Sequence, residues 1–328
     1  MKGDFKKLIH TPADLSVEHL NWARRNATMP GMSWGIPIVD KYVIPMRPGD
    51  LVGLIARPGH GKSSIMAYLA RTEAKRIMER NASDTEAVIY VTWESSAEEL
   101  ENFFAADDKI SASDVAWGRA DIDALTRKAV KRAAIPIWVI GHGIGRATAN
   151  TPRMTVDVVY SAIESMQADY GVKPTLVLLD YIQLIPVMQA GERVMQVTEA
   201  VIRAKELAQH AAVAAVAGVQ ARREVDTYKQ PIPEKADAQW ASGIEQTVDK
   251  LFGFWRPCLS PGFENQLIEV EGVPGTHDVN QRLIIMRMLK QRGEDGRRTW
   301  ALHFAPQYLK LNEIEFANDN TYQEEGKR

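Results

Sequence analysis

The chain has 328 residues, of which 45% are hydrophobic and 25% charged, and its formal net charge is -2. This composition is that of an ordinary globular protein, and the near-neutral charge excludes a protein that coats nucleic acid by overall attraction. The single cysteine, Cys258, excludes an internal disulfide, and no stretch approaches the roughly 18 apolar residues of a membrane span. We therefore expect a cytoplasmic protein without a membrane partner.

The amino-terminal region carries one amphipathic pattern, which predicts a helix from Leu15 to Asn26 ahead of a Pro30-Gly31 breaker. Residues 1–30 are accordingly assigned to a linker segment. From Leu51 onward, apolar runs alternate with helical patterns: a strand at 51–56, a helix at 64–76, a strand at 87–93 and a helix at 96–105. This alternation predicts parallel strands joined by crossover helices, and thus an α/β fold.

The rest of the chain contains further apolar runs that predict strands. They span residues 135–140, 175–180, 212–219, 250–255, 282–289 and 299–305, and the last two are expected to form an antiparallel edge of the sheet. Two polar segments without periodicity, 222–240 and 257–280, are predicted to be long loops, which in compact domains are usually functional. We assign residues 31–312 to one domain and expect the tail at 313–328 to be disordered.

Residues 56–63, with the sequence ARPGHGKS, fit the phosphate-loop pattern, with Ala56 in place of the usual first glycine. A predicted strand precedes the segment and a predicted helix follows it, as the motif requires. Its glycines let backbone amides point at phosphate oxygens, and the helix dipole adds positive potential. Lys62 is expected to reach the outer phosphates, and the Ser63 hydroxyl to bind Mg²⁺. The predicted nucleotide contacts are Arg57, Pro58, Gly59, His60, Gly61, Lys62, Ser63, Ser64 and, further along the chain, Asp180.

Three polar side chains follow other predicted strands, at the edge where ligands bind in open parallel sheets. Asp180 closes the run TLVLL and is a candidate second ligand for the metal, although many strands end in aspartate. Glu94 follows the run AVIYVTW and is a candidate general base for the attacking water, or else an acid at the start of the next helix. Gln220 follows AVAAVAGV and is positioned to sense the terminal phosphate.

Taken in order, the segments ARPGHGKSS, YVTWESSAEEL, LVLLDYIQLIPV, AVAGVQARR, SGIEQTVD and MLKQRGEDGRR resemble the motif series of the C-terminal motor domain of DnaB-type replicative helicases. The resemblance covers residues 34–306. It implies a RecA-like parallel-sheet ATPase fold, hydrolysis of ATP with Mg²⁺, a homohexameric ring, and 5′ to 3′ translocation on single-stranded DNA. A helicase loader or another replication protein is an expected partner, and the expected location is the nucleoid.

The resemblance also implies roles for individual residues. It makes Glu94 the catalytic base, Asp180 the magnesium-side carboxylate and Gln220 the coupling glutamine. It makes Lys290 and Arg292 fingers that enter the neighbouring subunit's site, where a cation neutralises charge on the transferring phosphoryl group. The alternative for Lys290 and Arg292 is a solvated pair at a strand end.

The ring architecture of the family suggests two further interfaces. The helix from Leu15 to Asn26 resembles the linker helix that docks on the adjacent subunit, although such a helix can also cap its own domain. The loops after Asp180 and Gln220 are expected to face a central channel. Single-stranded DNA would there be held by Arg193, Arg222, Arg223, Lys229 and Lys235, which are otherwise scattered surface charges.

The sequence departs from the family pattern in three places. About thirty residues precede the motor region, where the family usually carries an additional helical domain that contacts primase and loader. Gly218 stands where the family tends to place a serine, and Glu294-Asp295 bring acid beside the predicted fingers. Two other functions stay open: a recombination or regulatory ATPase that does not unwind DNA, and an adaptor that binds nucleotide without hydrolysing it. The presence of Glu94, Asp180 and Arg292 argues against the adaptor, because a protein that only binds nucleotide needs none of them.

Overall fold

The computed structural model of the chain describes residues 9–28, 31–105, 110, 112–145, 148, 150–188, 191–239, 242–293 and 297–314. The helices are α1 (Pro12–Thr28), α2 (Pro37–Asp40), α3 (Lys62–Glu79), α4 (Ala97–Ala105), α5 (Ala112–Ala116), α6 (Ile122–Ala133), α7 (Val156–Tyr170), α8 (Arg193–His210) and α9 (Ser242–Thr247). The strands are β1 (Leu51–Ala56), β2 (Glu86–Thr92), β3 (Ile137–Ile140), β4 (Lys173–Asp180), β5 (Ala214–Gln220), β6 (Lys250–Trp255), β7 (Leu267–Glu269), β8 (Thr276–Asp278), β9 (Leu283–Gln291), β10 (Arg298–Ala305) and β11 (Lys310–Glu313).

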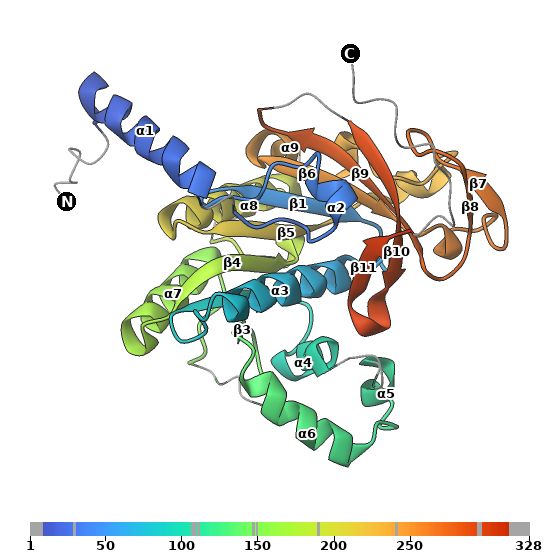
Figure 1. Cartoon of the computed structure of the whole chain (residues 1–328), viewed down its shortest axis with the longest axis horizontal. Coiled ribbons are helices and arrows are strands. Elements are labelled where there is room, and N and C mark those ends of the chain that lie inside the picture. Colours follow the sequence, from blue (N-terminus) through green and yellow to red (C-terminus); the bar gives the residue numbers. More distant parts are fainter. Residues whose placement is uncertain are drawn as a thin grey trace.

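One large sheet organises the molecule, with the strand order β11-β10-β9-β6-β1-β5-β4-β2-β3 (Figure 1). The strands from β6 to β3 run parallel to one another. By contrast, β9, β10 and β11 are antiparallel to their neighbours. Because β1 lies between β6 and β5, its carboxyl end is flanked by the ends of these two strands. A ligand site assembled at this edge can therefore draw on several strands.

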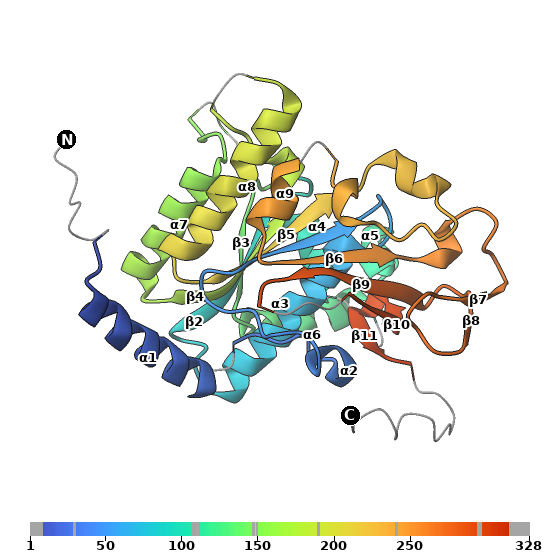
Figure 2. The same ribbon diagram turned by 90° about the horizontal axis from the view of Figure 1, so that it is seen from above.

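Both faces of the sheet are covered, which explains why the parallel strands are almost continuously apolar. On one face, Val52 and Leu54 of β1 pack with α3 and with the segment that precedes β1. On the other face, Leu51 and Ile55 pack with α7 and α8. Figure 2 shows α2 and α3 on one side of the sheet and α7, α8 and α9 on the other. The strand that leads into the phosphate loop is thus buried along its whole length.

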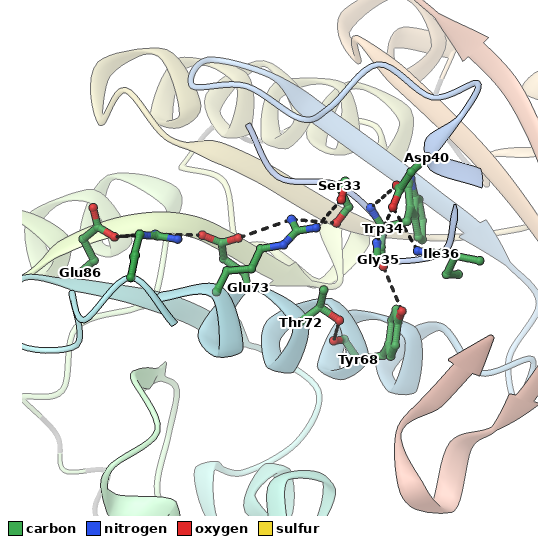
Figure 3. A network of polar contacts seen from close by, with 11 residues as sticks. Ser33, Trp34, Gly35, Ile36, Asp40, Tyr68, Thr72, Glu73 and Glu86 are labelled. Carbon is green, nitrogen blue, oxygen red and sulfur yellow. Dashed lines mark hydrogen bonds and ion pairs between the residues drawn. The ribbon is translucent and has the colours of Figure 1, made fainter. Parts of the chain in front are cut away.

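A polar network fastens the segment before β1 to α3 (Figure 3). The Asp40 carboxylate accepts hydrogen bonds from the three backbone amides of residues 34–36, and the Tyr68 hydroxyl donates to the Trp34 carbonyl at 3.0 Å. A row of hydrogen bonds and ion pairs continues along α3 through Ser33, Arg76, Glu73, Arg80 and Glu86. Since the row ends at the start of β2, it fixes α3, the helix of the phosphate loop, relative to its neighbours.

All the predicted strands form, each within two residues of its predicted bounds, and the antiparallel β9–β10 edge is confirmed. The prediction of an unstructured loop at 257–280 was wrong, because the segment contains the short β7–β8 hairpin. Strand β11 extends to Glu313, one residue beyond the predicted domain boundary at residue 312, and forms the outermost strand. Strands of three or four residues are too short for an alternation pattern to reveal. The rest of the predicted disordered tail, 315–328, lies outside the described residues, as does the acidic pair Glu294-Asp295.

The helix α1 stands apart from the body of the molecule in Figure 1. None of its residues is buried, and its apolar side chains Leu15, Val17, Leu20 and Trp22 are about half exposed or more. Its described contact with the domain includes the Arg47 guanidinium, 5.7 Å from the Trp22 ring centroid. The helix therefore does not cap its own domain by burying its apolar face. Among the described residues, no helix is long and apolar enough to cross a membrane.

Candidate active site

The phosphate loop connects β1 to α3, as the sequence predicts. Gly59 and Gly61 have φ angles of +79° and +89°, a backbone conformation that favours glycine. A side chain at Gly61 would also collide with Phe304, since a Cβ there would lie 2.6 Å from the Phe304 Cε1 atom. Among the described residues, no side chain caps the start of α3, so its first amides are available to an anion.

Polar residues from neighbouring strand ends converge on this loop. The register pairs Ala56 with Gln220 and Thr92 with Asp180, which brings the carboxyl ends of β1, β5, β4 and β2 to one edge. Lys62, at the start of α3, is only 9% exposed and lies with its Nζ atom 4.8 Å from the Tyr181 ring centroid. The fold therefore brings the predicted residues Lys62, Asp180 and Gln220 to the same edge of the sheet.

Gly218 explains how Lys62 reaches this position. A Cβ at Gly218 would lie 3.2 Å from the Lys62 Cδ and Cε atoms and 3.1 Å from the Tyr181 Cβ atom. These distances are tighter than ordinary van der Waals contact, so the lysine stem lies directly over the glycine. A side chain at position 218 would therefore crowd the stem of Lys62.

Asp180 is prepared for a cation. Its Oδ2 atom accepts a hydrogen bond from the buried Tyr90 hydroxyl at 2.7 Å, while its buried Oδ1 atom has no hydrogen-bond partner among the described residues. Burial and the nearby Asp180 charge raise the pKa of Tyr90 well above its ordinary value, so the hydroxyl stays a donor. A free carboxylate oxygen on Asp180 and the hydroxyl of Ser63 at the start of α3 are hard oxygen ligands of the kind that Mg²⁺ binds. The residues present therefore fit this ion.

Lys62 and Glu94 shift each other's titration. Burial lowers the pKa of Lys62, and the charges of Asp180 and Glu94 oppose that shift. Partial burial raises the pKa of Glu94, as does the charge of Asp180, while Lys62 lowers it. A carboxylate with a raised pKa is a stronger base than an ordinary glutamate, which suits a group that takes a proton from water.

Gln220 is held by Gln183, a residue of the segment LVLLDYIQLIPV to which the sequence assigned no individual role. The buried Gln183 side chain accepts a hydrogen bond from the Gln220 backbone amide at 3.1 Å and donates to the Gln220 carbonyl at 3.2 Å. The same carbonyl accepts the Gln239 amide at 2.9 Å. A polar residue within the apolar run YIQLIPV was the available signal for Gln183.

Two of the predicted nucleotide contacts have side chains that anchor the loop. The Arg57 guanidinium forms hydrogen bonds to the Asp226 carboxylate at 2.9–3.0 Å and to the Ala221 carbonyl at 3.1 Å. The His60 Nδ1 atom accepts the Arg256 backbone amide at 3.0 Å. Burial, reinforced by the charge of Arg256, lowers the pKa of His60 to about 4. Of the other predicted contacts, Pro58 is exposed and Ser64 is buried in α3.

Lys290 and Arg292 lie at the opposite edge of the sheet. The Lys290 Nζ atom donates to the Glu245 carbonyl at 2.5 Å, and Arg292 forms an ion pair with Asp249 at 3.1 Å. Burial and the charge of Arg292 lower the pKa of Lys290. The Arg292 amide bonds the Asp249 carbonyl, at the start of β6, whereas the phosphate loop lies beside the end of β6. The separation is about 16 Å along the strand, so neither cation reaches the chain's own loop.

The predicted DNA contacts differ in their surroundings. Arg222 forms an ion pair with Asp237 at 2.7 Å, and Lys235 lies 3.8 Å from a Glu245 carboxylate oxygen. Arg193 donates to the Gln183 carbonyl. Arg223 and Lys229 are exposed, and no ion pair involves either within the part of the chain that the structure describes. These two remain the more available cations of the set.

The family model described as "DnaB-like helicase C terminal domain" matches residues 31–313. The chain is similar to the "Replicative DNA helicase DnaB" of Rickettsia bellii (strain RML369-C), with 23% identity over 257 residues, which are 76% of this chain and 49% of that protein. It is also similar to the "Replicative DNA helicase DnaC" of Bacillus subtilis (strain 168), with 23% identity over 244 residues, 74% of this chain and 50% of that protein. The chain spans about half the length of these curated relatives.

Two solved structures share the fold. The first is an ATPase domain, which matches with a TM-score of 0.73 and 16% identity over 93% of this chain and 100% of that one. "The Structure Of A DnaB-Like Replicative Helicase And Its Interactions With Primase" matches with a TM-score of 0.69 and 17% identity over 90% of this chain and 66% of that one. These likenesses confirm the predicted RecA-like ATPase fold.

Proposed function

The chain belongs to the family of DnaB-like helicase C-terminal domains, and we propose that it is an ATP-driven motor that translocates on single-stranded DNA and separates duplex strands as a ring of identical subunits. One observation carries the proposal. The phosphate loop, Glu94 and Asp180 meet at one edge of the sheet, while Lys290 and Arg292 are held at the other edge. Each subunit then supplies half of two composite sites.

The chemistry within one subunit follows from its own side chains. The α3 amides and Lys62 bind the phosphates of ATP, and Ser63 and Asp180 hold Mg²⁺, which neutralises phosphate charge when bound. Glu94 takes a proton from a water molecule as the water oxygen attacks the γ-phosphorus. The bond between that phosphorus and the bridging oxygen breaks, which leaves ADP and inorganic phosphate. The raised pKa of Glu94 favours this proton transfer.

The second half of the site comes from the neighbour. Lys290 and Arg292 would neutralise the charge that develops on the transferring phosphoryl group, an effect worth several powers of ten in comparable enzymes. Hydrolysis would therefore require assembly. The exposed apolar face of α1 supports a role in that assembly, because its own domain leaves it uncovered.

DNA would lie along the loops that follow β4 and β5, where Arg223 and Lys229 are exposed. Contacts of lysine and arginine with the phosphate backbone are largely independent of sequence and weaken with salt. The 5′ to 3′ direction, a hexameric ring and contacts with a loader or primase are proposed from the family resemblance.

Mixing two inactive variants tests the composite site. Lys62→Ala removes the lysine that would contact the phosphates but keeps both fingers. Arg292→Ala keeps that lysine but removes one finger. Each alone should hydrolyse ATP very slowly in the presence of single-stranded DNA. Random co-assembly of equal amounts should restore up to about a quarter of the wild-type rate, since a quarter of the interfaces pair two intact halves. A mixture as inactive as its components would overturn the shared site.

Strand separation on a forked duplex tests the helicase function itself. The wild type should separate the strands with ATP and Mg²⁺, and Lys62→Ala should not. A wild type that hydrolyses ATP but never displaces a strand under any loading condition would instead be a regulatory or recombination ATPase. Electron microscopy with DNA would then distinguish a closed ring from an open filament.

A further inference from the structure

We propose that residues 221–239, here called the linking loop, couple a subunit's own nucleotide site to the finger hairpin β9–β10 that it presents to its neighbour. Asp226 and Glu234 would be the positioning residues of this coupling. The inference rests on the proposed function, because it assigns a purpose to two composite sites on one subunit. It is carried by contacts at both ends of the loop.

The base of the linking loop is attached to the nucleotide-binding edge at both of its ends. The Ala221 amide donates to the Ala56 carbonyl at 3.0 Å, at the start of the phosphate loop. Ala221 also pairs with Ala238 in an antiparallel bridge, and the Gln239 amide donates to the Gln220 carbonyl at 2.9 Å. The loop therefore leaves and returns beside Gln220, the residue expected to sense the terminal phosphate.

A side-chain contact adds a second attachment to the phosphate loop. Arg57 forms two hydrogen bonds to Asp226 through Nε and a third through Nη2, in the bidentate geometry that makes arginine–carboxylate pairs directional. Arg57 is well shielded, since its side chain is 14% exposed. Any displacement of the phosphate loop around a bound nucleotide is thus passed to Asp226.

The interior of the linking loop is organised as one unit around Asp237, which is fully buried. Its carboxylate accepts hydrogen bonds from the Arg222 guanidinium at 2.7 Å, the Tyr228 hydroxyl at 2.8 Å and the Glu234 amide at 2.8 Å. These donors come from the beginning, middle and end of the loop. One buried carboxylate thus joins three parts of the loop, and a displacement of one part is opposed by its hydrogen bonds to the others.

The far side of the linking loop contacts the finger hairpin. The Glu234 Oε1 atom accepts hydrogen bonds from the buried Arg287 of β9, at 2.9 Å, and from Arg297 next to β10. The loop also lies against β6, because a Cβ at Gly253 would be 2.6 Å from the Pro233 carbonyl oxygen. Arg287 precedes the first finger by three residues on the same strand. A movement of Glu234 is therefore transmitted to the hairpin.

The linking loop matters for coupling because the phosphate loop and the fingers, Lys290 and Arg292, do not contact each other directly. The fingers lie about 16 Å along β6 from the phosphate loop, and β6 itself is a buried strand that cannot lengthen. The linking loop meets the hairpin at Arg287, which is paired with Gly253 near the nucleotide-binding end of β6, and strand β9 carries the connection over the remaining three residues to Lys290. Nucleotide in one site can thus change the position of the cations offered to the next site.

The experiment measures the cooperativity of ATP hydrolysis by the assembled full chain with single-stranded DNA. Asp226→Asn and Glu234→Gln remove charge with little change of shape, and both should lower the Hill coefficient toward 1 while hydrolysis continues. Glu224→Gln is the matched control, since Glu224 lies in the same loop but has no ion pair among the described residues. Asp226→Glu, which keeps the carboxylate, should restore much of the cooperativity.

Assembly and thermal unfolding are measured for every variant. If Glu234→Gln does not fold, Arg297→Gln removes the exposed partner of the same contact. A wild type that hydrolyses ATP as an oligomer without cooperativity, or variants that keep its Hill coefficient, would overturn the coupling and leave the proposed function intact. Complete loss of hydrolysis in folded, assembled Asp226→Asn would also overturn it, since Asp226 would then belong to the catalytic site. A wild type that neither assembles nor hydrolyses ATP would contradict the proposed function instead.

Discussion

Acidification should destabilise the chain through His60. The ring is 6% exposed and accepts the Arg256 backbone amide through Nδ1 at 3.0 Å. A protonated imidazole has no lone pair at that nitrogen, so folding holds the ring neutral. His60→Asn places an amide oxygen close to the position of Nδ1, and it therefore keeps the acceptor while removing the titration.

The size and sign of the effect follow from the lowered pKa. His60 titrates at about 4 in the folded chain, whereas an exposed histidine titrates near about 6.5. Below about pH 6.5, His60 is protonated in the unfolded chain but stays neutral in the folded chain until the pH approaches 4. The free energy of unfolding therefore decreases as the pH is lowered through this window. Linkage gives a loss of about 2 kcal/mol between pH 7.5 and pH 5, and about 3 kcal/mol below pH 4.

Urea unfolding at pH 7.5 and pH 5 measures the effect, with the wild type and His60→Asn compared at each pH. Other titrating groups contribute equally to both proteins, so the difference between their two losses isolates His60. The wild type should lose about 2 kcal/mol more than the variant. His60→Leu, which leaves the Arg256 amide without its acceptor, should be less stable even at pH 7.5, by about 1–3 kcal/mol. Equal pH dependence in the wild type and His60→Asn would refute the argument.

Three other substitutions probe the site and the assembly. Glu94→Gln should lower the rate of ATP hydrolysis by about 10²–10⁴-fold, with nucleotide binding retained. Because the pKa of Glu94 is raised, the wild-type rate should begin to fall on acidification at a higher pH than it would with an ordinary glutamate as the base. Tyr90→Phe removes the hydrogen bond to Asp180 and should cost about 10–100-fold in hydrolysis or in Mg²⁺ affinity, as a Mg²⁺ titration would show. Leu20→Gln should change the free energy of unfolding by less than about 0.5 kcal/mol, because the side chain is exposed, yet weaken assembly measured by sedimentation.

The groups that sequence reasoning located are those tied to a strand end. Asp180, Glu94 and Gln220 were found because an apolar run marks a buried strand, and parallel strands present their carboxyl ends at one edge. Lys62 was found because the phosphate loop needs glycines in a fixed local pattern. In each case the signal is local in the sequence, and the sheet order supplies the rest.

The contacts that escaped prediction join residues far apart in the sequence. Arg57 and Asp226 are separated by 169 positions, and His60 and the Arg256 amide by 196. No periodicity or spacing in one sequence relates such pairs, because the pairing depends on how the loops pack. The same limit explains why the contacts by which the Arg57 and His60 side chains hold the loop in place were not predicted.

A single reversal of strand direction explains why the two proposed half-sites lie at opposite edges. Strands β6 and β1 are parallel, so their carboxyl ends reach the edge that holds the phosphate loop. Strand β9 pairs antiparallel with β6, and its carboxyl end, with Lys290 and Arg292 just at and beyond it, must therefore reach the other edge. A parallel strand at this position would have brought the same cations beside the chain's own phosphate loop. Each subunit therefore presents an anion-binding site at one edge and two cations at the other, which suits head-to-tail association of identical subunits. Such association closes into a ring when the rotation between subunits permits it.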